Sequence, residues 1–255
     1  MTQQTIIVTG ASQGLGAAIA SIAADQGAQV VLTARSEEKL AREAQRITQR
    51  GGKALAVAGD ISRLEDCRKI IDATLSTAGR IDALVNNAGT IEPLAQIAET
   101  RPEEWAHQIA VNLLGPMMMC RLAVPHLRET RGRVVNVTSH GAGLVIPGAS
   151  AYSASKAALN QFSKTLAAEE PAIVVILFIP GEVDTAMQAV IREKGEGKTT
   201  EDTYRFFVDL HEQGKLLPAT KPALAAAGLA LKAPGEWSGE ILEWDDDRVQ
   251  QLIRR

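Results

Sequence analysis

Cysteine, aromatic residues and charge of one sign are all scarce in this chain of 255 residues. Its only two cysteines, Cys67 and Cys120, belong to no CxxC pair, and no histidine cluster accompanies them. We therefore expect neither a disulfide framework nor a metal site, and we expect a reducing, cytoplasmic setting. The formal net charge is −3, so no field of one sign indicates nucleic acid or an anionic membrane as a partner.

Long hydrophobic runs and flexible linkers are missing as well. The longest apolar runs, near 172–179, have the length of a strand and fall far short of the roughly 20 residues that span a bilayer. The N-terminal stretch MTQQTIIVTG has no basic region followed by an apolar one, so we expect no secretory signal. Because no Pro- or Gly-rich linker divides the chain, we expect a single domain over residues 1–255.

What the chain does contain is an alternation of short β-branched runs and longer helical patterns. The short runs are mostly continuous Val, Ile and Leu, as in strands that are covered on both faces of a sheet. This repetition predicts an α/β fold, namely a single doubly wound, Rossmann-type parallel sheet with helices on both faces. The expected strands are 5–9, 30–34, 54–58, 83–86, 133–138 and 173–179, with a last strand at 240–244. The expected helices are 15–26, 37–50, 62–78, 102–128, 152–168 and 220–232.

The pattern weakens after the sixth expected strand. Residues 184–216 are rich in Gly, Glu, Lys and Thr, with a helical indication at 201–212. We expect an insertion over the strand ends that serves as a substrate lid. Phe206, Phe207 and Leu210 within it indicate an apolar pocket.

A glycine-rich sequence, TGASQGLG at 9–16, joins the first expected strand to the first helix. Gly10 allows a tight turn, while Gly14 and Gly16 let the backbone approach a pyrophosphate and pack helix on strand. The helix N-terminus offers free N–H groups to the anion. The spacing is GxxxGxG rather than GxGxxG, and the alternative is a glycine-rich turn without a ligand.

The end of the second strand indicates which dinucleotide binds. An NAD-selective site has a carboxylate there for the ribose 2′-hydroxyl. This chain has Ala34 followed by Arg35, and a guanidinium suits a 2′-phosphate. Ser12 and Ser36 could add hydroxyls, whereas Gln13 adds no second positive charge. We expect NADP(H), with a solvated arginine at a helix start as the alternative.

Tyr152 and Lys156 are four residues apart, so a helix brings them to one face. A nearby ammonium favours the phenolate, and we expect Lys156 to lower the pKa of Tyr152 from about 10 and make it a general acid. Ser139 ends a predicted strand and can donate a hydrogen bond to a carbonyl oxygen. The alternative is a surface lysine beside a half-buried tyrosine.

Asn112 lies inside the expected 102–128 helix, four residues before Pro116. Proline has no N–H, so the Asn112 carbonyl loses its helical partner and could hold a water that reaches Lys156. An ordinary proline kink is the alternative.

Together these residues resemble the short-chain dehydrogenase/reductase family over nearly the whole chain. TGASQGLG is similar to its phosphate motif, residues 86–89 to its NNAG motif, 59–61 to its adenine-contacting segment and 180–185 to its PGxVxT segment. The cofactor residues that the resemblance implies are Gly10, Ser12, Gly14, Leu15, Gly16, Arg35, Asp60, Ile61, Asn87, Ala88, Gly89, Tyr152, Lys156, Pro180, Gly181, Val183 and Thr185.

The same resemblance implies a catalytic set of Asn112, Ser139, Tyr152 and Lys156. In that family Tyr152 would protonate a carbonyl oxygen as hydride arrives from the nicotinamide, and Ser139 would polarise the carbonyl. Lys156 would hold the nicotinamide ribose, and the Asn112 carbonyl would anchor a relay water. Asn87 would contact the adenosine side or chiefly stabilise the sheet.

A narrower resemblance covers residues 166–188, which are similar to the sepiapterin reductase and fungal benzil reductase branch. It implies a homodimeric, NADPH-dependent carbonyl reductase of ketones or vicinal diketones. Asp246 falls near the acid that holds the pterin in sepiapterin reductases, with a solvated acidic turn as the alternative. Two other functions stay open: an alcohol dehydrogenase acting in the oxidative direction, and a dinucleotide-binding regulator without catalysis.

Overall fold

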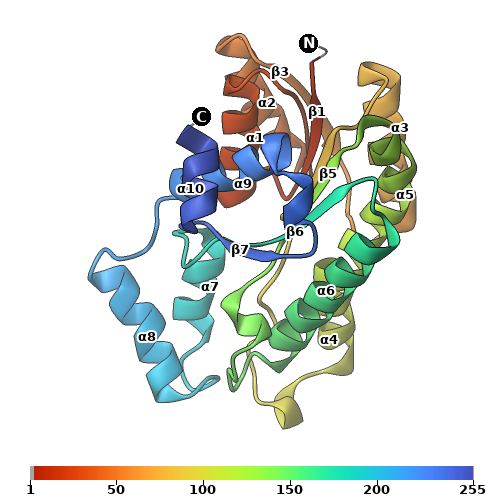
Figure 1. Cartoon of the computed structure of the whole chain (residues 1–255). Helices are drawn as coiled ribbons and strands as arrows, with labels where there is room; N and C mark the ends of the chain where they lie inside the picture. The colour runs from red at the N-terminus through yellow and green to blue at the C-terminus, as the bar shows by residue number, and fades with distance from the viewer. Residues whose placement is uncertain (1–2, 255) are drawn as a thin grey trace.

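Seven parallel strands form one twisted sheet in a computed structural model that describes residues 3–254 (Figure 1). The strands lie in the order β3-β2-β1-β4-β5-β6-β7. The chain order reverses between β1 and β4, and parallel sheets bind ligands at such a switch point, beyond the carboxyl ends of their strands. The strands are β1 (Thr5–Thr9), β2 (Gln29–Ala34), β3 (Lys53–Ala58), β4 (Ala83–Asn86), β5 (Arg133–Val137), β6 (Val174–Ile179) and β7 (Ile241–Glu243).

Helices cover both faces of this sheet, as the sequence predicts. The α-helices are α1 (Gly14–Asp25), α2 (Glu37–Gln49), α3 (Leu64–Ala78), α4 (Pro102–Ile109), α5 (Gly115–Thr130), α6 (Ser150–Glu169), α7 (Ala186–Lys194), α8 (Glu201–Glu212), α9 (Thr220–Lys232) and α10 (Asp247–Arg254). Shorter turns are the π-helical η2 (Ala110–Leu114) and the 3-10 turns η1 (Ile97–Glu99), η3 (His140–Ala142) and η4 (Gly235–Trp237). No helix within residues 3–254 is long and apolar enough to cross a membrane.

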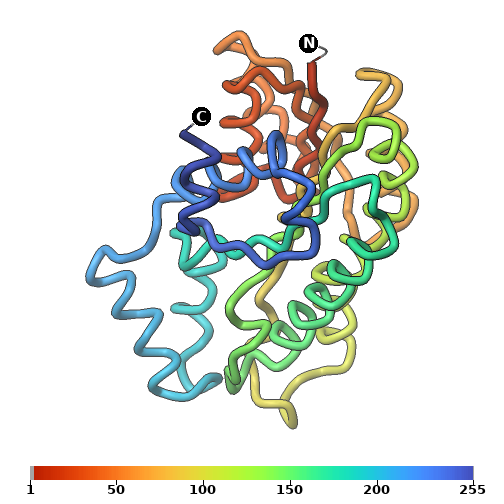
Figure 2. Tube along the Cα trace, in the orientation of Figure 1, coloured from red at the N-terminus to blue at the C-terminus, as the bar shows by residue number. Residues whose placement is uncertain are grey.

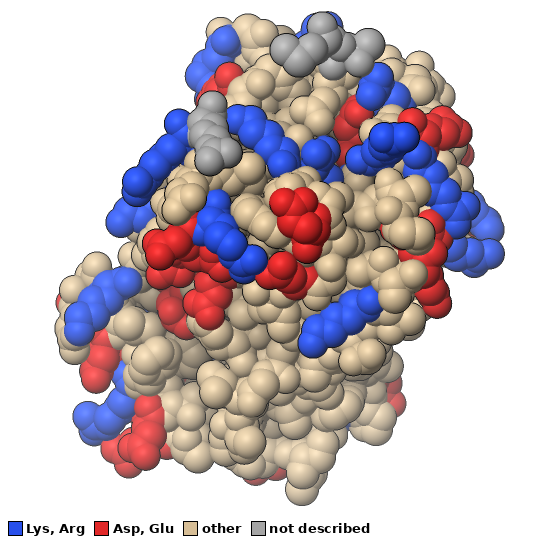
Figure 3. All heavy atoms as spheres, viewed as in Figure 1, with Lys and Arg blue, Asp and Glu red and all other residues tan. Residues whose placement is uncertain are grey.

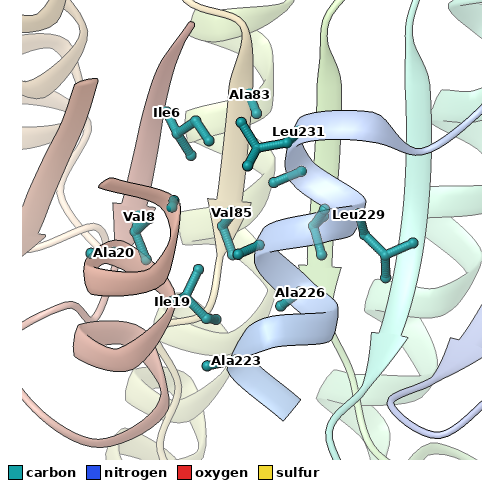
Figure 4. Packing of buried hydrophobic residues seen from close by; sticks show 14 of the residues in the cluster. Ile6, Val8, Ile19, Ala20, Ala83, Val85, Ala223, Ala226, Leu229 and Leu231 are labelled. Atoms are coloured by element: carbon teal, nitrogen blue, oxygen red, sulfur yellow. The ribbon is translucent and has the colours of Figure 1, made fainter. Parts of the chain in front are cut away.

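Neighbouring residues of one strand pack against opposite helix layers. Ile6 and Val8 of β1 belong to a cluster with α1 and α9, whereas Ile7 belongs to a second cluster with α3 and α5. Figure 4 shows Ile19 of α1 and Ala226 of α9 over β1 and β4. Because most positions of the inner strands are buried on one side or the other, these strands are continuous apolar runs, and the doubly wound fold is confirmed. The edge strands β3 and β7 are partly exposed.

The expected helix at 102–128 is interrupted. It divides into α4, the π-helical turn η2 and α5. Pro116 has no N–H to donate, and the Gly115 N–H reaches back five residues to the Ala110 carbonyl oxygen. The interruption therefore follows from the proline, and it lies at Asn112.

Two helices were not expected from the sequence. The α7 helix lies in the segment whose Gly, Lys and Thr content masks its apolar positions. The α10 helix has only eight residues, too few for a periodic pattern to stand out.

Residues 184–216 carry α7 and α8 and extend away from the sheet, as the cyan-to-blue part of the tube in Figure 2 shows. The two ends of this segment meet in a β-bridge between Val183 and Leu217. The Leu217 N–H donates to the Glu182 carbonyl oxygen at 2.8 Å, and the Asp184 N–H donates to the Leu217 carbonyl oxygen at 2.9 Å. The segment is thus anchored at its base just beyond the carboxyl end of β6.

We predict that Gly16→Ala destabilises the protein. A β-carbon there would collide with the Gly10 carbonyl oxygen and lie 2.5 Å from Asn87 Nδ2. Overpacking of this kind lowers the free energy of unfolding by about 1–3 kcal/mol, to be measured by urea denaturation. The matched control is Gly235→Ala, where a β-carbon meets nothing within 4 Å. Equal stability of the two variants would contradict the prediction.

Candidate active site

The glycine turn between β1 and α1 has the backbone that the sequence predicts. Gly10 and Gly14 have left-handed φ angles of +67° and +57°, which favour glycine. Among the residues described, no side chain caps α1, and its first turn contains no acidic residue. The N–H groups at its start are therefore available to an anion, and the turn fits a pyrophosphate.

Asn87 braces this turn from the neighbouring strand. Its Nδ2 donates to the carbonyl oxygen of Thr9 at 2.9 Å and to that of Gly10 at 3.4 Å. The Thr9 hydroxyl oxygen in turn accepts from the N–H groups of Asn87 and Ala88 at 3.0 Å. The structural role of the NNAG motif is therefore visible in the chain itself, beside any contact with a ligand.

Arg35 and Asp60 lie at the other end of the same region. Burial raises the pKa of Asp60, but hydrogen bonds from Ser62 and the charge of Arg35 outweigh it and hold that pKa below its ordinary value. Arg35 itself is exposed at the end of β2 and lines the cavity. A cation is thus present where a ribose 2′-phosphate would need one.

Tyr152 and Lys156 share the buried face of α6, with 9% and 4% of their surfaces exposed. The Lys156 Nζ donates to the Val137 carbonyl oxygen at 2.8 Å and lies 5.9 Å from the centroid of the Tyr152 ring. Burial lowers the pKa of Lys156 to about 8. The two side chains are therefore neighbours in a region shielded from water, unlike a surface lysine beside a half-buried tyrosine.

The expectation that Lys156 lowers the pKa of Tyr152 is wrong for the chain by itself. Burial raises the pKa of Tyr152, and a hydrogen bond with Ser139 opposes that rise without cancelling it. The phenol is removed from water, which disfavours the phenolate, and Lys156 is not among the causes of the shift. Tyr152 is therefore a neutral phenol at neutral pH.

Ser139 is oriented by the backbone that follows it. Its Oγ accepts a hydrogen bond from the Gly141 N–H at 3.0 Å. Because that bond uses a lone pair of the oxygen, the hydroxyl proton stays available for donation, and in the chain by itself it goes to the Tyr152 oxygen. Ser139 can thus donate to an oxygen placed beside Tyr152.

The Asn112 side chain connects two parts of the site by hydrogen bonds. Its Oδ1 accepts from the Thr90 N–H and its Nδ2 donates to the Thr90 carbonyl oxygen, both at 2.8 Å. The Nδ2 also donates to Ser155 Oγ at 3.1 Å, and Ser155 donates to the Tyr152 carbonyl oxygen at 2.7 Å. The side chain therefore links the loop after β4 to α6, a role that its sequence position did not indicate.

One cavity of about 1450 Å³ unites these elements. Of the expected catalytic and cofactor-binding residues, only Asn112 does not line it. The segment after β6 closes one wall, where the Thr185 methyl group lies near Gly14. On the side of Tyr152 the cavity has an apolar part of its wall, lined by Ile91, Leu94, Ile146, Met187, Ile191 and Phe207.

Ion pairs join α7 and the turn after it to the loop beyond β4. Lys194 pairs with Glu92 at 2.6 Å, and Lys198 pairs with Glu99 at 3.3 Å. Gly148 packs so tightly against the Lys198 carbonyl oxygen that a β-carbon would not fit. None of these contacts has a sequence signal, because each joins residues about 50 to 100 positions apart.

Asp246 does not line the cavity. Its carboxylate accepts from the Arg248 N–H at 2.8 Å and from the Arg248 guanidinium at 3.1 Å. The guanidinium hydrogen bond holds the pKa of Asp246 below its ordinary value. Asp246 thus accepts hydrogen bonds from the first turn of α10, as the alternative of a solvated acidic turn predicts.

Known proteins share both the sequence pattern and the architecture. A model of the short chain dehydrogenase family matches residues 4–196. An uncharacterized oxidoreductase from Saccharomyces cerevisiae is 34% identical over 254 residues, covering 98% of this chain and 99% of that protein. The crystal structure of a short chain dehydrogenase/reductase from the same yeast has a TM-score of 0.93 at 33% identity, covering 98% and 99% of the two chains.

A variant of actinorhodin polyketide ketoreductase, solved with NADPH, has a TM-score of 0.85 at 26% identity and covers 94% of this chain and 95% of that one. None of these three relatives carries the name of a sepiapterin or benzil reductase, so the narrower resemblance remains a prediction.

We predict a pH-dependent stability contribution from Lys156. Its pKa is about 8 when folded and 10.5 ordinarily, so between these values the unfolded chain binds more protons and stability from this group rises with pH. Below pH 8 the buried charge destabilises the fold by on the order of 3 kcal/mol. Lys156→Met should remove that cost, so the gain in free energy of unfolding over wild type should shrink as pH rises.

The measurement is urea denaturation of wild type and variant across this pH range. Lys164→Met, at an exposed position of the same helix, is the matched control. A difference between wild type and Lys156→Met that stays constant with pH would contradict the prediction.

Proposed function

This chain belongs to the short chain dehydrogenase family and is an oxidoreductase of that kind, and from this premise we propose that it is an NADPH-dependent carbonyl reductase. Its substrate is a ketone or a vicinal diketone. The observation that carries the proposal is the meeting of Ser139, Tyr152 and Lys156 with the glycine turn in one cavity.

The cofactor would be held along the carboxyl ends of the strands. The start of α1 and its glycine turn suit the pyrophosphate, and Arg35 suits the 2′-phosphate. Asp60 and Ile61 are assigned to the adenosine side, and Val183 and Thr185 to the nicotinamide side. When bound, NADPH supplies the hydride that reduces the carbonyl carbon.

The chain supplies the proton. Tyr152, kept neutral by burial, donates its hydroxyl proton to the carbonyl oxygen, which becomes the alcohol. Ser139 donates a hydrogen bond to the same oxygen and stabilises the charge that builds there. The Lys156 ammonium, 5.9 Å from the ring centroid, stabilises the phenolate that remains. Solvent returns the proton, and we assign the Asn112 carbonyl in the π-helical turn to the relay water.

The cavity wall favours an apolar diketone over a pterin. Ile91 is in one buried cluster with Tyr152, and Ile146 and Phe207 pack against that cluster. Such side chains gain from covering an uncharged, apolar substrate. The carboxylate expected to hold a pterin, Asp246, is bonded to Arg248 and lies outside the cavity. The segment 184–216, which forms part of this wall, is assigned the role of the lid.

Two further assignments accompany the activity. We assign the protein to the cytoplasm because Cys67 and Cys120 are free thiols, which cell fractionation tests. We assign it a homodimer through α5 and α6, since Leu114, directly before α5, and Met117 of α5 are 40% exposed. Charged side chains are also few over α6 in the lower part of Figure 3. Light scattering should then give twice the chain mass of 27.2 kDa.

The alternatives are less well supported. Oxidation of an alcohol would use the same residues, but Arg35 favours the phosphorylated cofactor, whose pool is kept reduced. A regulator without catalysis has no reason to retain the complete set of Ser139, Tyr152 and Lys156 at one cavity.

We predict that Tyr152→Phe binds NADPH like wild type and loses turnover of benzil about 100-fold or more, because the proton donor is absent. NADPH oxidation with a panel of ketones, benzil and sepiapterin measures turnover, and benzil should exceed sepiapterin. The control is Tyr204→Phe, which removes the other tyrosine hydroxyl, bonded to the Arg192 carbonyl oxygen on the lid segment. Undiminished turnover by Tyr152→Phe would refute the proposed proton donor.

A further inference from the structure

Basic residues follow one another from the end of β2 through α2 and just past its end, and two of them differ from the rest. The paired ones are Arg42 with Glu38 at 2.8 Å, Arg46 with Glu43 at 2.7 Å and Arg50 with Asp25 at 3.4 Å. Arg35 and Lys39 have no carboxylate within ion-pair distance in the part of the chain that the structure describes. These same two residues line the cavity, and the three paired arginines do not.

Lys39 is also held in place. Its Nζ donates to Gln13 Oε1 at 2.9 Å. Gln13 precedes α1 at the end of the glycine turn and lines the cavity as well. The amide oxygen leaves two of the three ammonium protons available to another acceptor. The Lys39 side chain of α2 is thus held against the glycine turn, which fits the pyrophosphate.

The positive charge of Arg35 is partly offset by the nearby carboxylate of Asp60. The Arg35 charge is one of those that lower the pKa of Asp60, so the guanidinium and that carboxylate attract each other. Part of the field of Arg35 is therefore offset before any anion arrives. A phosphate monoester, which carries close to two negative charges at neutral pH, would be poorly balanced by Arg35 alone.

We propose that Lys39, positioned by Gln13, is the second cation for the 2′-phosphate of NADP(H) and a determinant of cofactor preference. The inference rests on the proposed NADPH-dependent function and adds a residue to it. Gln13 adds no positive charge of its own, as the sequence indicates, but its amide oxygen holds the Lys39 ammonium at the turn. A neutral 2′-hydroxyl gains little from an ammonium, so the contact discriminates NADPH from NADH.

The test measures dissociation constants by calorimetry for NADPH, NADH, 2′,5′-ADP and 5′-AMP, without any turnover. Lys39→Met should raise the dissociation constants of NADPH and 2′,5′-ADP about tenfold. It should leave those of NADH and 5′-AMP within about twofold of wild type. Lys39→Arg should restore most of the loss. Gln13→Ala should raise the dissociation constants of only the two 2′-phosphorylated ligands, and by less than Lys39→Met does. The Lys39 ammonium is still present in this variant, but the side chain that positions it is gone.

Arg42→Met is the matched control. It removes one positive charge from the same helix at a position outside the cavity, so it reveals any effect of net charge alone. If wild type prefers NADPH and Lys39→Met keeps the same NADPH-to-NADH ratio as Arg42→Met, the inference is overturned and the proposed function stands. If wild type binds neither dinucleotide, both fail.

Discussion

The site depends on removing an ammonium and a phenol from water side by side. Lys156 and Tyr152 are almost fully buried on one face of α6, and the only hydrogen-bond partner that the described residues give Lys156 Nζ is the Val137 carbonyl oxygen. Taking an ammonium out of water costs several kcal/mol, which a single neutral hydrogen bond does not return. The same burial keeps Tyr152 protonated, and a protonated phenol is what a reductase needs before hydride transfer.

Polar contacts between elements that are distant in the sequence hold Lys156 and Tyr152 in position. Asn112 links Thr90 to Ser155 and through it to the backbone of Tyr152, while Asn87 links the glycine turn to β4. These amides are acceptors and donors for backbone groups that would otherwise be buried without partners.

Much of this arrangement could be predicted from the sequence, because the signals for it lie within short segments of the chain. Continuous apolar strands, the glycine turn and the four-residue spacing of Tyr152 and Lys156 are each contained within one short segment. Lys39 could not be found that way, because on α2 it looks like any other solvated lysine until the fold brings Gln13 to it. The direction of the Tyr152 pKa shift was wrong for the same reason, since burial is a property of the packed structure.

The central claim, that burial and charge together set the proton affinity of Tyr152, can be measured directly. The chain has only two tyrosines, so tyrosinate absorbance in a Tyr204→Phe background titrates Tyr152 alone. Without cofactor the pKa should lie above its ordinary value of about 10. With NADP⁺ it should fall, because the positively charged nicotinamide favours the phenolate. An ordinary pKa in the free protein, or one that NADP⁺ leaves unchanged, would contradict the account.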